Sequence, residues 1–264
     1  MGIINLTPDS FSDGGKSYSP QAALAHAEKL IAEGADILDL GAESTRPQAE
    51  PIDAATEFSR LIPAIKALRQ KFPKIPLSID TYKAEIAEAA IQAGGDIIND
   101  IEGGNYVQSG THGAMAKTCA RLKCPLILMH RRPEARYENF WGEVVDDLRR
   151  SIRLALEAGV APQQIWTDPG FGFGKTPTQN LMLIRDLEKI SALGYPVVIG
   201  TSRKSTLGLV LQETDPLRRH EGNVATAIWA INQGCSMVRV HEVAPIIKYL
   251  QVADALRRGP NWTP

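Results

Sequence analysis

The sequence predicts an α/β protein with the (β/α)₈ (TIM) barrel fold, in which eight parallel strands alternate with eight helices. Short apolar runs recur eight times, each followed by a stretch with helical periodicity, and 264 residues is about the length that such a barrel needs. A doubly wound open sheet is the alternative, because counting elements in one sequence does not prove that the sheet closes. No linker or low-complexity segment divides the chain, so we expect a single domain over residues 1–264.

The predicted strands are apolar at consecutive positions rather than at alternate ones. This pattern is typical of parallel strands that are buried on both faces. In chain order we expect strands at residues 2–5, 37–40, 77–80, 97–99, 126–129, 165–167, 197–200 and 237–240.

Between these runs, apolar residues recur with a period near 3.6, which indicates amphipathic helices. The clearest stripes are Phe58, Leu61, Ile62, Ile65 and Leu68; Val145, Leu148, Ile152 and Leu156; and Ile246, Leu250, Ala253 and Leu256. Glycines that are expected to end helices in a left-handed conformation stand at Gly34, Gly94, Gly159, Gly194 and Gly234. Two loops, at residues 7–18 and 41–53, are longer than a barrel needs, and such loops often bind ligands.

Composition excludes several classes of function. The chain has 29 Lys and Arg against 30 Asp and Glu, a net charge of −1, so no general attraction to nucleic acid or to an anionic membrane is expected. No apolar run approaches a membrane span, and the N-terminus lacks the features of a targeting segment. Three cysteines, Cys119, Cys124 and Cys235, form no CxxC pair and no even disulfide set. We therefore expect buried thiols in a cytoplasmic protein.

The most specific short motif is DPGFGFGK at residues 168–175, after an apolar run. Its glycines at alternate positions permit positive φ angles and a close backbone approach to a ligand. The motif is not a P-loop, because Pro169 stands where that pattern needs a glycine, and not a dinucleotide-binding loop, because Lys175 replaces the third glycine. A tight turn in which Asp168 caps a helix is the structural alternative.

Polar side chains stand at or just beyond the C-terminal end of every predicted strand. In chain order they are Asn5; Glu43, Thr45 and Arg46; Asp80; Asn99 and Asp100; His130; Asp168; Ser202, Arg203 and Lys204; and Arg239 and His241. A salt bridge or a helix cap explains any one of them, but burying so many polar groups without partners is costly. In a barrel these strand ends meet at one mouth, which predicts a binding site there.

The chemistry of these side chains falls into two groups. The first consists of Asp80, Asn99, Asp168 and Lys204. A carboxylate accepts two parallel N–H bonds from a guanidine-like ring edge, so this group suits a flat polar heterocycle. The second group, Arg46, Arg239 and His241, is cationic and suits phosphate. Asn5 is an oxygen ligand without an acidic cluster beside it, which fits Mg²⁺ held mainly by substrate phosphates and water.

At eight places the sequence resembles the dihydropteroate synthase family. The matching stretches are GIINLTPDSFSDGG (2–15), ESTRP (43–47), SIDTY (78–82), IIND (97–100), LMH (128–130), DPGFGFGK (168–175), GTSRKS (200–205) and RVHEV (239–243). They follow the family order, each at a strand exit, and cover most of the chain. LMHRR and GTSRKS are most similar to the Gram-positive bacterial branch.

The resemblance implies a folate-pathway transferase that condenses 6-hydroxymethyl-7,8-dihydropterin diphosphate with p-aminobenzoate and releases pyrophosphate. Its implied pterin pocket is Asp80, Asn99, Met129, Asp168, Phe173 and Lys204. Its implied diphosphate site is Asn5, Arg46, Arg239 and His241, with Asn5 as the ligand of Mg²⁺. Its implied p-aminobenzoate subsite is Phe11, Thr45, Pro47 and Ser205. The residues expected to be catalytic are Asp80, Lys204, Arg239 and His241.

A dissociative mechanism is expected, because no Ser-His or Cys-His pair is apparent for covalent catalysis. The resemblance further implies a homodimer that binds small molecules, and a family targeted by sulfonamides. Two alternatives remain: a methyltetrahydrofolate methyltransferase domain, which needs no diphosphate site, and a pterin-binding protein that has lost turnover.

Overall fold

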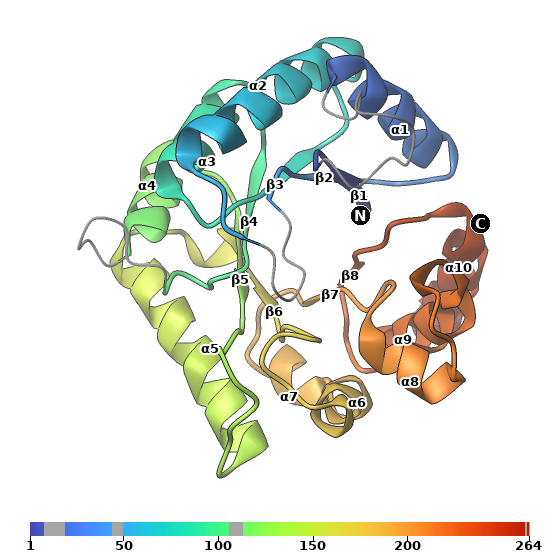
Figure 1. Ribbon diagram of the computed structural model, residues 1–264. Helices are drawn as coiled ribbons and strands as arrows, with labels where there is room; N and C mark the ends of the chain where they lie inside the picture. The colour runs from blue at the N-terminus through green and yellow to red at the C-terminus, as the bar shows by residue number, and fades with distance from the viewer. Residues whose placement is uncertain (8–18, 44–49, 106–112, 262, 264) are drawn as a thin grey trace.

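The computed structural model describes residues 1–7, 19–43, 50–105, 113–261 and 263 (Figure 1). Within them the strands are β1 Gly2–Asn5, β2 Leu38–Gly41, β3 Leu77–Asp80, β4 Ile97–Asp100, β5 Leu126–Met129, β6 Ile165–Asp168, β7 Val198–Ile199 and β8 Met237–Val238. The helices are α1 Pro20–Ala32, α2 Ala54–Lys71, α3 Ala84–Gln92, α4 Ala114–Leu122, α5 Phe140–Glu157, α6 Pro177–Arg185, α7 Glu188–Ser191, α8 Ser205–Leu211, α9 His220–Asn232 and α10 Ala244–Arg258. None of these helices has the length and apolar character that a bilayer crossing requires.

The strands form a closed parallel barrel. Strands β1 to β6 pair in sequence order, and β7 pairs with β8. Single parallel bridges from Thr167 to Val197 and from Gly2 to Val240 link β6 to β7 and β8 back to β1. Figure 1 looks along the resulting ring, with the helices around its outside. In a doubly wound open sheet the strand order reverses at a switch point, so that alternative is wrong. The predicted (β/α)₈ barrel is confirmed.

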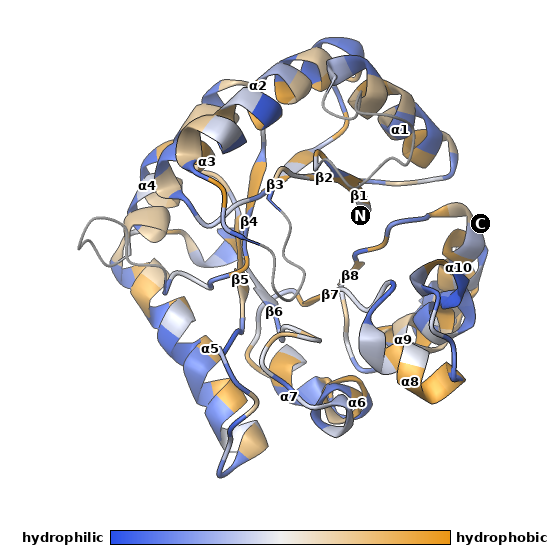
Figure 2. Ribbon diagram, in the orientation of Figure 1, coloured by the Kyte–Doolittle hydropathy of each residue, from blue (hydrophilic) through white to orange (hydrophobic). Residues whose placement is uncertain are grey.

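Alternate residues of each strand face opposite sides of the barrel wall. In β5, Leu126 and Leu128 belong to the large core beneath the helices, whereas Ile127 packs with Met1 and Val198 in a smaller cluster inside the ring. Figure 2 shows the strands coloured as largely hydrophobic and the helices as mixed, as expected for a wall covered by amphipathic helices.

Three of the polar residues predicted at the strand ends belong to the inward-facing set. Ile97, Trp166 and Met237 pack against the cluster inside the barrel. Two residues further along the same strands or their exits stand Asn99, Asp168 and Arg239. Since side chains two positions apart share a face, these polar groups also face the barrel axis, one layer closer to the mouth.

The predicted strands are confirmed, with boundaries that differ by one or two residues. Strand β2 begins and ends one residue later than predicted, and β4 and β6 extend to Asp100 and Asp168. Strands β7 and β8 are shorter than predicted, because Val197 and Val240 form only isolated bridges to their neighbours. All five glycines expected at helix exits have positive φ angles, between 83° at Gly194 and 115° at Gly94, as predicted.

The helical stripes are buried at some positions and exposed at others. Leu61, Leu68 and Ile152 are buried, whereas Phe58 is 48% exposed and Leu256 is 78% exposed. An 18-residue helix such as α2 is about 27 Å long, whereas a four-residue strand such as β3 covers about 13 Å. The outer turns of such helices therefore extend beyond the sheet, and part of each stripe is exposed.

Candidate active site

The parallel register places polar residues of neighbouring strands side by side at the mouth. Asn5 of β1 pairs with Gly41 of β2, Gly41 with Asp80 of β3, and Asp80 with Asn99 of β4. Asn99 pairs with Ile127 of β5, and two residues further along β5 Met129 pairs with Asp168 of β6. The mouth is therefore lined in order by residues that the sequence predicted for one site.

Arg239, at the exit of β8, crosses the mouth to two carboxylates. Its Nε donates to Oδ2 of Asp39 at 2.6 Å, and its Nη2 donates to Oδ2 of Asp80 at 2.7 Å. Burial raises the pKa of Asp80 to about 7, although the Arg239 guanidinium acts in the opposite direction. Burial lowers the pKa of Arg239, but Asp39 and Asp80 outweigh it and the pKa lies above its ordinary value. Arg239 is thus charged at any physiological pH.

Asp168 ends β6 and begins the DPGFGFGK loop. One of its carboxylate oxygens accepts the backbone N–H of Gly170 at 2.7 Å, which closes a local turn. Helix α6 after the loop is capped by Thr176 and Gln179 in a reciprocal capping box. The alternative reading, in which Asp168 caps this helix, is therefore wrong. Burial raises the pKa of Asp168, while the Gly170 N–H and the Lys204 ammonium lower it.

Lys204 approaches the same loop from the exit of β7. Its ammonium group donates to the carbonyl oxygen of Phe171 at 2.9 Å and lies 4.0 Å from the centre of the Phe173 ring. Burial lowers the pKa of Lys204 to about 8, and the Asp168 carboxylate acts against this shift. The mouth therefore holds an ammonium group beside an aromatic face and a buried carboxylate, as expected of a site for a flat polar ring.

Lys175 holds the DPGFGFGK loop from its other end. Its ammonium group donates to the carbonyl oxygens of Gly170 at 3.0 Å and Phe173 at 2.9 Å, and contacts Nδ1 of His130 at 2.9 Å. Nε2 of His130 lies 3.2 Å from Oδ2 of Asp147, so the Nε2–H tautomer satisfies both neighbours. The lysine thus points at carbonyls of its own loop, and not outward as a P-loop lysine does.

Three loop glycines make this geometry possible. Gly170, Gly172 and Gly174 have φ angles of 70°, 86° and 61°, as the motif predicted. A Cβ atom at Gly170 would lie 1.8 Å from the carbonyl oxygen of His130, and one at Gly174 would lie 2.1 Å from that of Arg132. The loop therefore packs directly on the backbone that follows β5.

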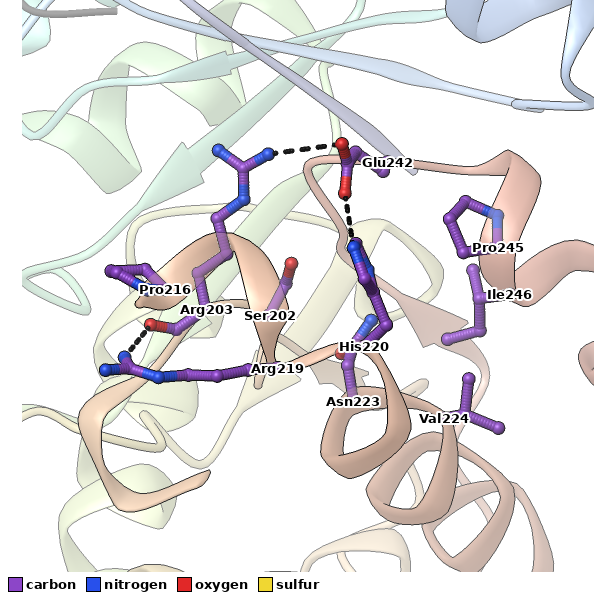
Figure 3. A pocket seen from close by; sticks show the side chains of 10 residues that line it. All are labelled: Ser202, Arg203, Pro216, Arg219, His220, Asn223, Val224, Glu242, Pro245 and Ile246. Carbon is purple, nitrogen blue, oxygen red and sulfur yellow. Dashed lines mark hydrogen bonds and ion pairs between the residues drawn. The ribbon is translucent and has the colours of Figure 1, made fainter. Parts of the chain in front are cut away.

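His241, beyond β8, is oriented by Ser202 beyond β7. The Ser202 Oγ accepts the backbone N–H of His241 at 3.3 Å and lies 3.0 Å from its Nδ1. With the serine hydroxyl donating to Nδ1, the proton of the neutral ring is on Nε2. Figure 3 shows Ser202 beside a small pocket where Glu242 contacts Arg203 and His220 at 3.5 and 3.4 Å.

The turn between Ser202 and Lys204 is strained. Arg203 has a φ angle of 63°, a left-handed conformation that non-glycine residues rarely adopt. Nη1 of Arg219 donates to the Arg203 carbonyl oxygen at 2.9 Å and supports this backbone (Figure 3). Strain of this kind is often found where a structure holds functional side chains in place.

A second buried ion cluster lies at the start of the loop after β2. The ammonium group of Lys83 contacts Glu43 at 2.5 Å and Glu57 at 2.6 Å, and the Tyr82 hydroxyl donates to Glu43 at 2.7 Å. Glu43 directly precedes residues 44–49 in the sequence. The cluster therefore fixes the chain at the point where the predicted residues Thr45, Arg46 and Pro47 follow.

Most of the predicted site residues meet at the mouth, and some lie outside the described residues. Those at the mouth or its rim are Asn5, Asp80, Asn99, Met129, Asp168, Phe173, Lys204, Ser205, Arg239 and His241. Those outside the described residues are Phe11, Thr45, Arg46 and Pro47. Ser205 is exposed at the start of α8.

Sequence reasoning assigned no role to three residues that organise the site, namely Asp39, Lys175 and Ser202. Each had a signal in the sequence. Asp39 is an acid inside an apolar run, Lys175 ends the most specific motif, and Ser202 precedes the Lys204 turn.

Lys175 gives a stability prediction that depends on pH. Burial lowers its pKa from 10.5 to about 7, with Asp168 and Asp147 acting against Lys204 and Arg132. The folded chain therefore binds fewer protons than the unfolded chain between these values, and the contribution of Lys175 to stability rises with pH across that window. Replacing it by Met removes this contribution. The free energy of unfolding of the wild type relative to Lys175→Met should increase from pH 7 to pH 10 by more than about 1.4 kcal/mol, the equivalent of one pKa unit.

Urea denaturation of both proteins at each pH measures this difference. Lys66→Met, at an exposed position of α2, is the matched control and should show no pH-dependent difference. A difference that stays constant for Lys175→Met between pH 7 and pH 10 would show that the ammonium group is not desolvated.

Comparison with known proteins identifies the family. The family model of pterin binding enzymes matches residues 1–241. A dihydropteroate synthase of Bacillus subtilis (strain 168) is 45% identical over 256 residues, which are 97% of this chain and 87% of the relative.

Two solved structures share the fold over nearly the full length. A dihydropteroate synthase of Clostridium difficile, determined in the presence of pteroic acid, superposes with a TM-score of 0.91 at 40% identity and covers 97% of this chain and 95% of that one. A dihydropteroate synthase of Xanthomonas albilineans with 4-aminobenzoic acid has a TM-score of 0.91 at 39% identity and covers 98% and 93%. The chain therefore belongs to the family of pterin binding enzymes, among its dihydropteroate synthases.

Proposed function

We propose that this protein is a transferase that condenses 6-hydroxymethyl-7,8-dihydropterin diphosphate with p-aminobenzoate to give 7,8-dihydropteroate and pyrophosphate. The observation that carries the proposal is the convergence at one barrel mouth of Asp80, Asn99, Asp168, Lys204 and Arg239. Neither alternative accounts for this set together with relatives that are dihydropteroate synthases over almost their whole length. An assay of pyrophosphate release and dihydropteroate formation with both substrates tests the proposal, and pyrophosphate release without formation of dihydropteroate would contradict it.

In this proposal the pterin lies in the mouth against Met129 and Phe173. Asp168 accepts N–H bonds from the amino-pyrimidine edge of the ring, since its carboxylate is buried and lies near the Lys204 ammonium. Asn99, which is only 5% exposed, offers amide donors and an acceptor to the same ring. Phe173 places its face beside Lys204, so the ring would be held between apolar surface and polar edges.

The diphosphate would lie toward Arg239, His241 and Arg46. Asn5, half-buried at the end of β1, offers the amide oxygen proposed for Mg²⁺. Among the described residues no three His, Cys, Asp or Glu side chains are arranged to bind a metal ion. A single protein oxygen of this kind fits Mg²⁺ that takes its other ligands from phosphate and water, and there the ion would neutralise charge on the leaving group.

The chain's own residues support a dissociative reaction. The bond between the pterin methylene carbon and the diphosphate oxygen breaks first, and Arg239 and His241 stabilise the departing anion. The electron-rich pterin ring and the Asp80 carboxylate stabilise the cationic methylene carbon. The amine of p-aminobenzoate then attacks that carbon and loses a proton. Lys204 holds the ring by its polar edge throughout.

The p-aminobenzoate subsite is proposed at Phe11, Thr45, Pro47 and Ser205.

We further propose a homodimer, a cytoplasmic location and a single functional domain over residues 1–264. Large apolar side chains are exposed on the last helices, including Val210 of α8, Trp229 of α9 and Val252 of α10, and a second copy would cover them. All three cysteines are free and buried, which supports a reducing compartment.

The first functional prediction concerns Asp168. The variant Asp168→Asn places an amide N–H against a pterin donor, and an unpaired buried donor costs on the order of 1–3 kcal/mol. Pterin affinity measured by calorimetry should fall at least tenfold. The control Asp254→Asn, at an exposed position of α10, should bind as the wild type does. Unchanged affinity in folded Asp168→Asn would refute the assignment.

The second prediction concerns His241. The variant His241→Ala should weaken pyrophosphate binding about tenfold, because it removes a donor from the phosphate group, while changing the affinity for a phosphate-free pterin less than about twofold. His220→Ala is the matched control, since His220 lies nearby but contacts Glu242. Equal weakening of both ligands by His241→Ala would mean that His241 is structural.

The third prediction concerns the order of binding. Because the p-aminobenzoate subsite is proposed largely on the two long loops, p-aminobenzoate should bind well only after the pterin and diphosphate sites are filled. Titration into the free enzyme should give an affinity at least about tenfold weaker than titration with pterin, pyrophosphate and Mg²⁺ present, a difference of about 1.4 kcal/mol. The same affinity in both titrations would indicate a preformed subsite.

A further inference from the structure

Asp39 is a fully buried acid in the middle of β2. The residues on either side of it, Leu38 and Leu40, face the core beneath the helices, so Asp39 faces the interior of the barrel. Ile37, two residues earlier, packs against the apolar cluster inside the ring. Asp39 therefore lies one layer below the mouth, where a carboxylate is costly unless positive or polar groups surround it.

The Asp39 side chain contacts one residue of each proposed subsite. Its Oδ2 accepts Nε of Arg239 at 2.6 Å and Nδ2 of Asn99 at 3.3 Å. Its Oδ1 has no hydrogen-bond partner among the described residues. One buried oxygen thus holds both the guanidinium proposed for the diphosphate and the amide proposed for the pterin.

This arrangement leaves Arg239 shared between two acids. Asp39 binds its Nε, and Asp80 binds its Nη2 at 2.7 Å. A pterin that donates to Asp80 and a diphosphate that binds Arg239 both compete with the Asp80–Arg239 contact. Asp39 does not take part in that competition, because it is fully buried.

We propose that Asp39 is a positioning residue for the reaction, acting as the permanent counterion of Arg239 while it orients the Asn99 amide. It keeps Nε of the guanidinium in place when Asp80 and the phosphate exchange partners, so the remaining N–H groups stay directed at the leaving group. The predicted effect of Asp39 on turnover rests on the proposed function. The predicted effect of Asp39 on the charge of Asp80 does not.

The charge of Asp39 also acts on Asp80. Burial raises the pKa of Asp80 to about 7, Arg239 and Lys204 lower it, and Asp39 and Glu57 raise it. Removing the Asp39 charge therefore lowers the pKa of Asp80. If ionised Asp80 binds the pterin, the loss of pterin affinity at acidic pH should then begin at a lower pH.

The test uses Asp39→Asn, which keeps the size of the side chain and removes its charge. Calorimetric binding of 6-hydroxymethylpterin between pH 5 and pH 9 should show the acidic midpoint shifted down by about half a pH unit or more. The kcat for pyrophosphate release should fall at least tenfold. Asp36→Asn, an exposed acid just before the same strand, is the control and should change neither quantity. An unshifted midpoint or an unchanged kcat in Asp39→Asn would overturn the proposal.

Asp39→Glu covers the case in which Asp39→Asn does not fold. This variant keeps the charge but moves it by one methylene group. The acidic midpoint of pterin binding should therefore stay unchanged, while kcat should fall at least tenfold. A kcat equal to that of the wild type would overturn the proposal. If the wild type itself releases no pyrophosphate, the proposed function fails. The shift in the midpoint of pterin binding still decides whether the charge of Asp39 raises the pKa of Asp80.

Discussion

The parallel pairing of the strands into a closed ring is the constraint on which the rest of the structure depends. It gives every strand the same direction, so all the C-terminal ends meet at one mouth. The register then places Asn5, Asp80 and Asn99 at one level. Because the wall alternates inward and outward side chains, the same eight runs supply both an apolar core under the helices and a polar lining at the mouth. Residues far apart in the chain therefore meet at one site.

Inside this ring the mouth is organised by charges that balance one another. Arg239 is shared by Asp39 and Asp80, and Lys204 stands near Asp168. Desolvation moves the pKa of Asp80 up to about 7 and the pKa of Lys204 down to about 8. Both groups can therefore gain or lose a proton near neutral pH. Such perturbed groups in one cleft are typical of sites that bind and transform a polar substrate.

The DPGFGFGK loop is held by lysines on two sides. Lys204 binds the carbonyl of Phe171, and Lys175 binds those of Gly170 and Phe173. His130 and Asp147 anchor Lys175 to the segment after β5 and to helix α5. A glycine-rich loop loses much conformational entropy on ordering, and these charged hydrogen bonds offset that cost. These backbone contacts, together with the Lys204 ammonium group 4.0 Å from the ring centre, hold the Phe173 ring in place.

The sequence by itself determined the fold class, the eight strand positions and the set of polar strand-end residues. Those features depend on local periodicity and on glycine and apolar spacing, which a linear chain displays directly. Only the tertiary structure decided which acid Arg239 meets, that Ser202 orients His241, and that Lys175 points back into its own loop. These contacts join residues from 5 to 200 positions apart, and no local pattern encodes the partner of a buried charge. Asp39 shows the boundary between the two. The sequence shows it only as an acid inside an apolar run. Its inward direction and its pairing with Arg239 exist only because the strands form a ring in which β8 lies beside β1.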